Sequence, residues 1–304
     1  MSRKLVECVP NVSEGRDKEA VAAMAEAIRS VPNVFLLDVQ SDPDHHRSVF
    51  TFVGAPEAVA EAVFRLFEAA LPRIDLRHHR GEHPRMGAVD VVPFVPVRGL
   101  NMADCVELAK KVGEEIWRRF RVPVYLYGEA ATRPERADLS EIRKGEFEGF
   151  FEKIKDPQWA PDFGEPMVHP TAGVTAVGAR EFLIAFNVNL GTSDLRVAKE
   201  IAKAVRFSSG GLRYVKALGM ELKERGIVQV SMNLTNFRKT PLPRVLELVR
   251  REAARFGVPV VGTEIVGLIP EEALVQVAEY YLQLEKFSLG QVLERRIEEA
   301  LGGT

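Results

Sequence analysis

The strands and helices predicted for this chain occur twice in the same order, and that repeat limits the folds the chain can adopt. In the first half, apolar residues with a period of two predict strands at residues 5–11, 34–39, 47–54 and 88–97. Apolar residues with a period near 3.6 predict helices at residues 17–31 and 55–71. The order is β-α-β-β-α-β, which is the split βαβ or ferredoxin-like unit.

The second half repeats this order after a connector at residues 133–178 that is rich in proline and glycine. Its strands are predicted at residues 181–190, 213–222, 226–237 and 259–270, and its helices at residues 193–207 and 242–257. A further helix and strand at residues 102–128 extend the first half, and a helix from Pro270 closes the second. We therefore predict an α+β fold of two ferredoxin-like subdomains, at residues 1–178 and 179–304, with helices on one face of each sheet.

The composition agrees with two domains and excludes some classes of function. The chain has 304 residues, of which 46% are hydrophobic, enough for two cores. Its net charge is −2 with both signs interspersed, which argues against nucleic-acid or membrane partners. Without a stretch that reads as a signal peptide or a membrane span, we expect a cytoplasmic protein. Cys8 and Cys105 cannot form a disulfide framework, and we expect both to be reduced.

One face of the second predicted sheet carries uncharged hydrogen-bonding side chains. Asn187 and Asn189 alternate with apolar residues in strand 181–190, and Gln229 and Ser231 do the same in the strand that follows residue 226. Helices cover one face of a split βαβ unit, so these side chains belong to the open face. That face is either a solvated surface or one wall of a ligand groove between the halves. The uncharged amides favour the groove, because solvent faces more often carry lysine and glutamate.

Residues 77–87, RHHRGEHPRMG, concentrate histidine and arginine in a segment that cannot be a regular helix. Gly81 and Pro84 interrupt a helix, and Pro84 favours an extended conformation at His83. The four-residue spacing of His79 and His83 would suit a metal on a helix, but this break argues against it. A histidine held between a glycine and a proline, directly before a buried strand, has the rigid mount that catalysis requires.

Three other interpretations stay open on this evidence. The residues His78, His79 and Arg80 can form an ordinary solvated loop. A metal-dependent hydrolase would use the four histidines at positions 45, 46, 79 and 83. A sensor would bind folate or an amino acid without turnover, but it gives no reason for a rigidly mounted histidine. Fold class alone does not separate these possibilities.

Five motifs resemble the formiminotransferase domain family: VECVPNVSEGR, GEHPRMGAVDVVPFVPV, VPVYLYGEAA, WAPDFG and FLIAFNVNL. The resemblance extends from about Leu5 to Tyr281. It implies glutamate formimidoyltransferase activity, in which N-formimidoyl-L-glutamate and tetrahydrofolate give L-glutamate and 5-formimidoyltetrahydrofolate during histidine degradation. It also implies two ferredoxin-like subdomains with the substrates between them, assembly as a homodimer, and tetrahydrofolate as a co-substrate. We expect no metal, because of the break at Gly81 and Pro84.

The resemblance also assigns residues. The histidine of GEHPRMG, which is the catalytic base in the family, is His83. The folate-binding stretch after WAPDF corresponds to Gly164, Glu165, Pro166, Met167, Val168, His169, Pro170, Thr171, Ala172 and Gly173. Two positions differ from residues that are frequent in the family: His46 precedes Arg47 where relatives often have asparagine, and Gln40 replaces an aspartate.

The chemistry of the reaction suggests further residues. A formimidoyl group on an amine is a cationic amidine, so its transfer needs one proton removed from folate N5 and one given to the glutamate nitrogen. An imidazole does both near neutral pH. Both substrates carry carboxylates, for which arginine is the usual partner. We therefore expect the substrate to be bound by Arg47, Arg85, Asp38, Asn187 and Asn189, with Asp38 facing the amidinium and Arg47 and Arg85 the carboxylates.

The sequence leaves the transferred group open and gives an expectation about the step that follows transfer. A formyl group has the same shape as a formimidoyl group with oxygen in place of nitrogen, so a glutamate formyltransferase acting on 5-formyltetrahydrofolate is an alternative. The family's all-helical cyclodeaminase domain does not follow residue 304, and we expect cyclisation of the transferred group to belong to a separate protein.

Overall fold

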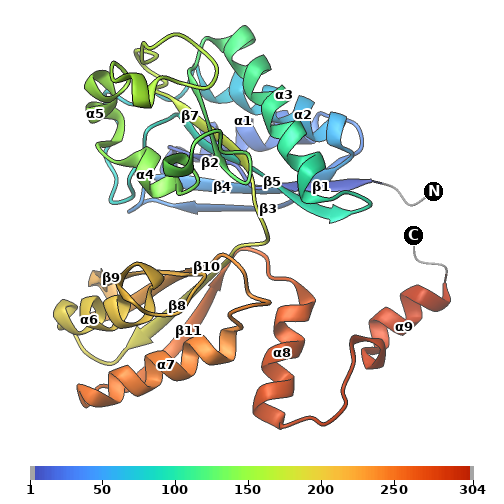
Figure 1. Ribbon diagram of the computed structural model, residues 1–304, viewed down its shortest axis with the longest axis vertical. Helices are drawn as coiled ribbons and strands as arrows, with labels where there is room; N and C mark the ends of the chain where they lie inside the picture. The colour runs from blue at the N-terminus through green and yellow to red at the C-terminus, as the bar shows by residue number, and fades with distance from the viewer. Residues whose placement is uncertain (1–3, 302–304) are drawn as a thin grey trace. The chain divides into compact units, whose positions relative to one another are not determined.

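The computed structural model describes residues 4–301, which form two compact units that divide between Arg180 and Glu181 (Figure 1). Residues 1–3 and 302–304, at the outer ends of the two predicted subdomains, lie outside the described range. Both units combine helices with a β-sheet, so the α+β class predicted from the sequence is confirmed. No described helix has the length and apolarity that crossing a membrane requires.

The first unit contains the sheet on which His83 and its neighbours are mounted. Its strands are β1 (Leu5–Cys8), β2 (Asn11–Val12), β3 (Val34–Asp42), β4 (Arg47–Gly54), β5 (Val89–Arg98), β6 (Val124–Gly128) and β7 (Thr175–Ala179). Its helices are α1 (Lys18–Arg29), α2 (Pro56–Ala70), α3 (Met102–Phe120), α4 (Leu139–Arg143) and α5 (Glu146–Lys153), with short 3₁₀ turns at Pro134–Arg136 and Pro157–Trp159.

Across this sheet the strands follow the order β3, β4, then β1 and β2 end to end, then β5, β7 and β6. The strand predicted at residues 5–11 is thus two short strands separated by Val9 and Pro10. Pro10 has no N–H to donate, and its carbonyl accepts from Phe50 at 3.0 Å. Pairing is antiparallel from β3 to β5 and parallel from β5 through β7 to β6.

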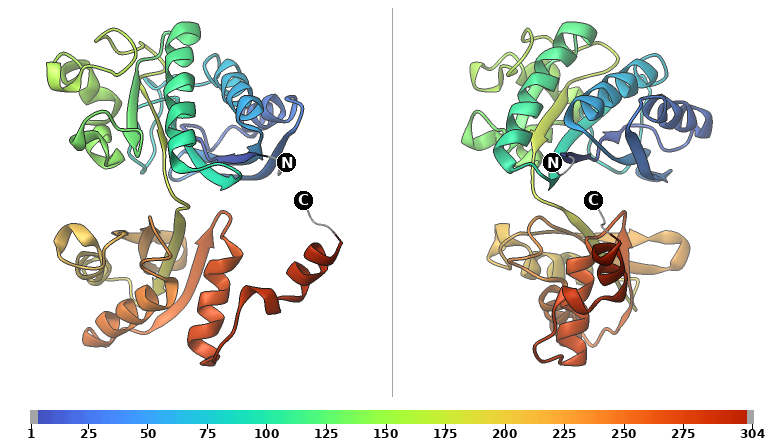
Figure 2. Two further views of the ribbon diagram at one scale, coloured as in Figure 1. Left: turned by 45° about the vertical axis from the view of Figure 1, so that its right-hand side comes forward. Right: turned by 90° about the vertical axis from the view of Figure 1, so that its right-hand side faces the viewer.

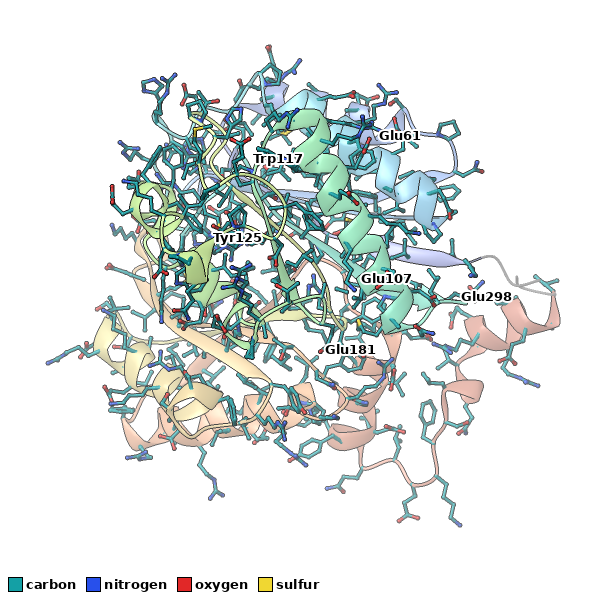
Figure 3. The ribbon with its side chains drawn as sticks, turned by 45° about the horizontal axis from the view of Figure 1, so that its top comes forward. Glu61, Glu107, Trp117, Tyr125, Glu181 and Glu298 are labelled. Atoms are coloured by element: carbon teal, nitrogen blue, oxygen red, sulfur yellow. The ribbon has the colours of Figure 1, made fainter. Side chains whose placement is uncertain are left out.

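Helices α1, α2 and α3 lie side by side over one face of the sheet and bury its apolar side chains (Figure 2). Asp17 caps the start of helix α1, and its carboxylate accepts hydrogen bonds from two backbone N–H groups of the first turn. Helix α3 begins with a capping box between Asn101 and Asp104. The outward side of α2 and α3 is charged, as Glu61 and Glu107 illustrate (Figure 3). Amphipathic helices of this kind cover a sheet and meet solvent on their other side.

The connector differs from its prediction, because it contains a strand and covers the second face of the sheet. Strand β7 inserts between β5 and β6. Val124 of β6 faces α3, since its side chain approaches Gly113 there. The next residue, Tyr125, points to the opposite face and packs against Phe150 of α5, with ring centroids 5.5 Å apart. The expectation of helices on one face only is therefore incomplete at this edge.

The second unit contains strands β8 (Ile184–Leu190), β9 (Val215–Leu222), β10 (Ile227–Leu234) and β11 (Val260–Val266), in the antiparallel order β11-β8-β10-β9. Its helices are α6 (Leu195–Val205), α7 (Leu242–Arg255), α8 (Glu271–Leu282) and α9 (Leu293–Ala300), with 3₁₀ turns at Phe207–Ser209, Lys223–Arg225 and Leu289–Gln291. The apolar side chains of β8 and β10 form one buried cluster with those of α6 and α7. The amides of β8 and β10 therefore point away from these two helices, as the alternation predicted.

Candidate active site around His83

His83 and Arg47 are in direct contact in the first unit. Arg47 is the first residue of β4, and His83 lies in the loop between α2 and β5. Nη1 of Arg47 is 2.5 Å from Nε2 of His83, and Nδ1 of His83 is 2.7 Å from the carbonyl oxygen of Pro84. A guanidinium only donates and a carbonyl only accepts, so Nε2 carries the lone pair and Nδ1 the proton. The imidazole is therefore neutral.

The surroundings of His83 keep its imidazole neutral well below neutral pH. Burial, the Arg47 guanidinium and the Arg143 guanidinium lower the pKa of His83 to about 2. Burial is also the main reason that the pKa of Arg47 falls to about 10, followed by repulsion from Arg143. The side chains around this point, including His45, Asp90 and Ser13, pack without room for a water molecule between them.

The loop that carries His83 is fixed to the sheet by Asp90. One carboxylate oxygen of Asp90 accepts hydrogen bonds from the backbone N–H groups of Met86 at 2.7 Å and Gly87 at 3.1 Å. Its other oxygen binds Arg143 through Nη2 and, at 2.9 Å, through Nε. Gly81 allows the loop to approach the turn before β4, because a Cβ atom there would be 2.3 Å from the carbonyl oxygen of His45. These contacts explain why His83 lies beside Arg47.

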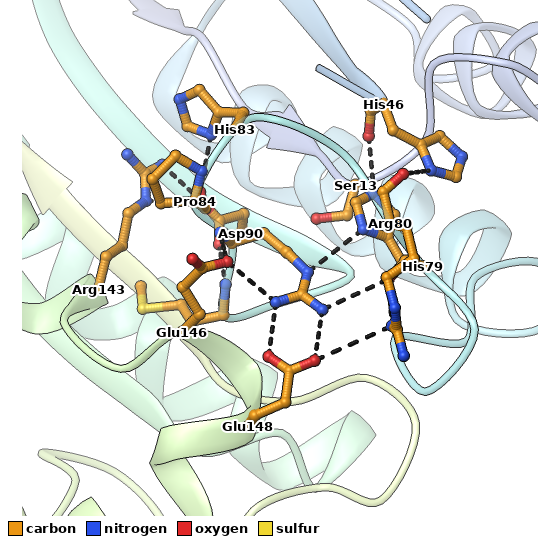
Figure 4. A network of polar contacts seen from close by, with 12 residues as sticks. Ser13, His46, His79, Arg80, His83, Pro84, Asp90, Arg143, Glu146 and Glu148 are labelled. Atoms are coloured by element: carbon orange, nitrogen blue, oxygen red, sulfur yellow. Dashed lines mark hydrogen bonds and ion pairs between the residues drawn. The ribbon is translucent and has the colours of Figure 1, made fainter. Parts of the chain in front are cut away.

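Arg85 was expected to bind a substrate carboxylate, but its guanidinium binds two carboxylates of its own chain, those of Glu146 and Glu148, which are labelled in Figure 4. It forms two hydrogen bonds of 2.7 Å with Glu148 and one of 3.0 Å with Glu146, at the start of α5. Its Nε donates to Nδ1 of His79 at 3.3 Å. The side chain is 8% exposed. The arrangement favours a role for Arg85 in holding the His83 loop against α5.

The neighbouring histidines form a second hydrogen-bonded group. His46 and His79 stack with ring centroids 4.1 Å apart. His46 contacts Glu14 through Nε2 at 3.1 Å and the Arg80 carbonyl through Nδ1 at 3.0 Å, and His79 donates from Nε2 to the His46 carbonyl at 2.8 Å. The Glu14 pKa is lowered even though burial alone would raise it, because the N–H groups of residues 17 and 16 and the His46 ring stabilise the carboxylate.

These hydrogen bonds bear on the metal interpretation. Both ring nitrogens of His46, His79 and His83 already have protein partners. The described residues contain no group of three His, Cys, Asp or Glu side chains arranged to hold a metal ion. A hydrolase site built on these histidines would first have to break most of their hydrogen bonds, which disfavours that alternative.

The predicted folate segment, residues 164–173, packs against the predicted catalytic segment. Gly173 has φ +71° and lies so close to Met86 that a Cβ atom there would be 2.1 Å from the Met86 carbonyl oxygen. The N–H of Ala88 donates to the Ala172 carbonyl at 2.9 Å, and His169 and Gly173 pair with each other. Met167, near the other end of the segment, is 66% exposed. The two motifs predicted to serve catalysis and folate binding are therefore neighbours.

The motif WAPDFG, which precedes this segment, has a structural role that its residues explain. Asp162 accepts hydrogen bonds from the N–H of Leu126 and from the buried Arg136, each at 2.8 Å, and from the hydroxyl of Thr132. Arg136 also binds the carbonyl oxygens of residues 158 and 160. The ion pair holds two parts of the connector together, and the hydrogen bond from Leu126 joins Asp162 to β6.

Asp38 lies on the same face of the sheet as Arg47. It pairs with Thr51 across β3 and β4, and Arg47 pairs with Asp42 four residues along the same strands. Among residues 4–301 the Asp38 carboxylate has no hydrogen-bonding or ion-pair partner. The partly buried Asn11 and Gln40, each paired with Val49, lie on this face between the two charges. The face thus carries an unpaired anion at one point and a guanidinium at another.

The two asparagines predicted to bind substrate lie in the second unit. Asn189 is 2% exposed and donates to Glu264 at 2.9 Å, and it accepts from Gln229 at 2.8 Å. Glu264 also receives a hydrogen bond from Arg225. Asn187 is partly buried opposite Ser231. The amide-rich face therefore holds a connected polar network, and we describe it apart from His83 because it belongs to the other unit.

Sequence reasoning did not single out Arg143, Asp90, Glu146 or Glu148. Asp90 follows GEHPRMG within its longer motif, and its position in an otherwise apolar strand is a signal that a buried carboxylate needs partners. Arg143 and the two glutamates occur in a charged stretch, EIRKGEFEG, that reads as ordinary surface. Their contacts depend on how the connector folds back, which local patterns do not encode.

Comparison with known proteins extends these observations. Residues 5–180 match the family described as formiminotransferase domain, N-terminal subdomain, and residues 185–301 match the formiminotransferase domain. A glutamate formimidoyltransferase of Streptococcus pyogenes serotype M1 is 50% identical, over 97% of this chain and 99% of that protein. A glutamate formimidoyltransferase of Thermoplasma acidophilum is 53% identical, over 97% of this chain and 98% of that protein. The formimidoyltransferase-cyclodeaminase of Rattus norvegicus is 47% identical over 93% of this chain and 53% of that protein.

Proposed function

Because the chain belongs to the formiminotransferase domain family, we propose that it is a glutamate formimidoyltransferase with tetrahydrofolate as its co-substrate. The observation that carries this proposal is the alignment, nearly end to end, with two relatives of that name at 50% and 53% identity. The GEHPRMG segment supports it, because its histidine is a neutral imidazole held in one orientation.

In the reaction that we propose, N5 of tetrahydrofolate attacks the amidinium carbon of formimidoylglutamate and forms a tetrahedral intermediate. Nε2 of His83 takes the proton from N5 and gives it to the glutamate nitrogen. The bond between that nitrogen and the carbon then breaks, and glutamate leaves as the amine. The positive charge stays on the transferred amidinium, so atoms and charges balance. A positioned general base of this kind contributes roughly 10² to 10⁴ in rate.

We assign the substrate contacts by charge. Arg47 binds a carboxylate of formimidoylglutamate, and Asp38, which has no partner among the described residues, faces its amidinium. The Gly164–Gly173 segment binds folate, and its packing against Met86 and Ala88 supports a place beside His83. Arg85 contributes by fixing the loop, since its guanidinium already binds Glu146 and Glu148.

We further propose that each unit is a ferredoxin-like subdomain, with chain boundaries near residues 178 and 179, and that the protein is a homodimer without metal. The strand order β11-β8-β10-β9 supports the first point for the second unit. A ligand groove between the two units, lined in part by Asn187 and Asn189, stays a prediction. Sedimentation analysis and elemental analysis of the purified protein test the dimer and the absence of metal.

A paired assay tests the proposed activity. The purified protein is given tetrahydrofolate with either formimidoylglutamate or formylglutamate, and release of glutamate is measured. We expect turnover with formimidoylglutamate to exceed turnover with the formyl compound. Equal or greater turnover with formylglutamate would favour the formyltransferase alternative, and binding of folate without glutamate release would favour the sensor.

A further inference from the structure

The contact between Arg47 and His83 has a consequence for how catalysis begins. A general base needs its lone pair free, but Nε2 of His83 accepts a hydrogen bond of 2.5 Å from Arg47, and Nδ1 is bound to the Pro84 carbonyl. Neither nitrogen can take a proton from a substrate while both contacts hold. The close packing of the surrounding side chains points in the same direction. In this form the imidazole is blocked.

The two guanidinium groups beside His83 differ in how well they are paired. Arg143 is bound by Asp90, which also fixes the loop, so this pair has a structural task. Arg47 is half-buried, and among the described residues His83 is its only hydrogen-bonding partner. Asp90 and Asp42 act on it only at longer range, and Arg143 repels it. A buried cation without a contacting anion is costly, and a guanidinium has five N–H donors to offer a carboxylate.

We propose that Arg47 is a carboxylate-operated gate: a substrate carboxylate draws its guanidinium away from Nε2 of His83 and thereby makes the base available. This inference rests on the proposed function, because it assigns the carboxylate to formimidoylglutamate or glutamate. The carboxylate gains a charge-assisted partner, and His83 loses a hydrogen-bond donor and gains a nearby negative charge. Both changes make Nε2 more basic.

The groups that face His83 fit this assignment. Arg47 approaches His83 from β4, and Arg143 approaches it from α4. His45 approaches from the turn before β4, and its ring centroid is 6.1 Å from that of His83. Asp90 of β5 is bound to Arg143. His45 itself is paired with Asp42 at 2.9 Å. Of the two cations, Arg47 is the one whose departure breaks no ion pair among residues 4–301. The gate makes catalysis depend on the carboxylate of the substrate. An amidine substrate that lacks a carboxylate would therefore leave Nε2 of His83 bound to Arg47.

The test follows the His83 ring by NMR in the full chain labelled with ¹⁵N-histidine, with L-glutamate as the probe and a His83→Gln spectrum for assignment. In the free wild type we expect a neutral Nδ1–H ring that does not titrate between about pH 8 and 5. With saturating glutamate the His83 pKa should rise toward the ordinary value of about 6.5. Arg47→Ala should raise the His83 pKa without glutamate and show no further change with it; the rise is partial, because burial and Arg143 also lower this pKa.

Two variants control this experiment. Arg73→Ala removes an exposed arginine at the end of α2 and should behave as the wild type does. Arg47→Lys keeps the positive charge. If Arg47→Ala does not fold, Arg47→Lys replaces it as the test, and we expect glutamate to raise its His83 pKa less than that of the wild type. The gate is overturned if glutamate binds by calorimetry while the His83 ring is unchanged, if it does not bind at all, or if Arg47→Ala leaves the His83 pKa as low as in the wild type.

A kinetic readout separates the gate from the activity itself. With the base blocked only in the free enzyme, the acidic limb should appear near pH 6 to 7 in kcat, which reports the bound state, and not in kcat/KM. A wild type that turns over formimidoylglutamate but shows the same limb in both profiles rejects the gate and keeps the proposed function. A wild type without turnover rejects the function, whatever the ring does.

Discussion

The carboxylate of Asp90 joins Arg143 of α4 to the backbone of the His83 loop, with one oxygen on the guanidinium and the other on two N–H groups. A single buried side chain therefore sets both the position of the loop and the charge beside the imidazole. Asp90 is 1% exposed, so nothing in solvent can substitute for either contact.

Replacing Asp90 with asparagine should destabilise the protein strongly. The amide oxygen can still accept from the loop, but Arg143 is left without its anion, and breaking a buried pair in this way costs about 3–5 kcal/mol. Urea denaturation should show this loss. Asp75→Asn is the matched control, because it removes a carboxylate that binds exposed Arg77 and should leave the midpoint unchanged. Equal midpoints for Asp90→Asn and the wild type would contradict the assignment.

Replacing Gly173 with alanine should affect both stability and folate binding. The positive φ alone costs about 1–3 kcal/mol for a residue with a Cβ atom. The clash with the Met86 carbonyl adds roughly 1–3 kcal/mol, or forces the two segments apart. Gly210→Ala is a close control, since Gly210 has φ +94° and open space around its Cβ position. Only Gly173→Ala should raise the KM for tetrahydrofolate, and a similar rise in both variants would show that the packing is not responsible.

Replacing His83 with alanine should lower kcat by about 10² to 10⁴ while changing either KM little. The loss appears in kcat because the imidazole acts on protons that move only during the reaction. Steady-state kinetics with both substrates measure it, and His78→Ala serves as the control, since the His78 side chain is 82% exposed. An increase in KM with turnover retained would instead make His83 a binding residue.

The pH dependence of stability should also report His83. Its pKa is lowered to about 2 in the folded protein, whereas an unfolded histidine titrates near 6.5. Below about pH 6.5 the unfolded chain binds a proton that the folded chain does not, so stability falls as the pH falls. His83→Gln should flatten this decline by up to about 1.4 kcal/mol per pH unit between about pH 6 and 4. An unchanged slope in urea denaturation at several pH values would show that His83 titrates normally.

Local patterns predicted most of the framework, and the exceptions have physical reasons. Periodicity detects elements that have one apolar side. Two examples are strand β4, Arg47–Gly54, with its alternating pattern, and helix α2, Pro56–Ala70, with its helical period. Strand β7, Thr175–Ala179, was missed because all five residues are small and buried on both faces, so no alternation marks them.

The site was predicted where it depends on local sequence and missed where it depends on tertiary contacts. Gly81 and Pro84 already indicate a fixed loop around His83, and the motifs indicate the folate segment. That Arg85 would bind Glu146 and Glu148, 61 and 63 residues away, could not be read from its surroundings. The same holds for the contact of Arg47 with His83, which spans 36 residues.

The place of β7 between β5 and β6 sets an order for folding of the first unit. Val124 of β6 pairs with Thr175, and Val91 of β5 pairs with Ala176. Both strands are therefore synthesised before β7, the strand that pairs with them. Until residue 179 has left the ribosome, β5 and β6 each have an edge without its final partner, and such edges are open to pairing with other chains. Closing the sheet through contacts so distant in sequence is slow compared with forming the local hairpin of β3 and β4. Insertion of β7 therefore also brings the segment that ends at Gly173 against the His83 loop.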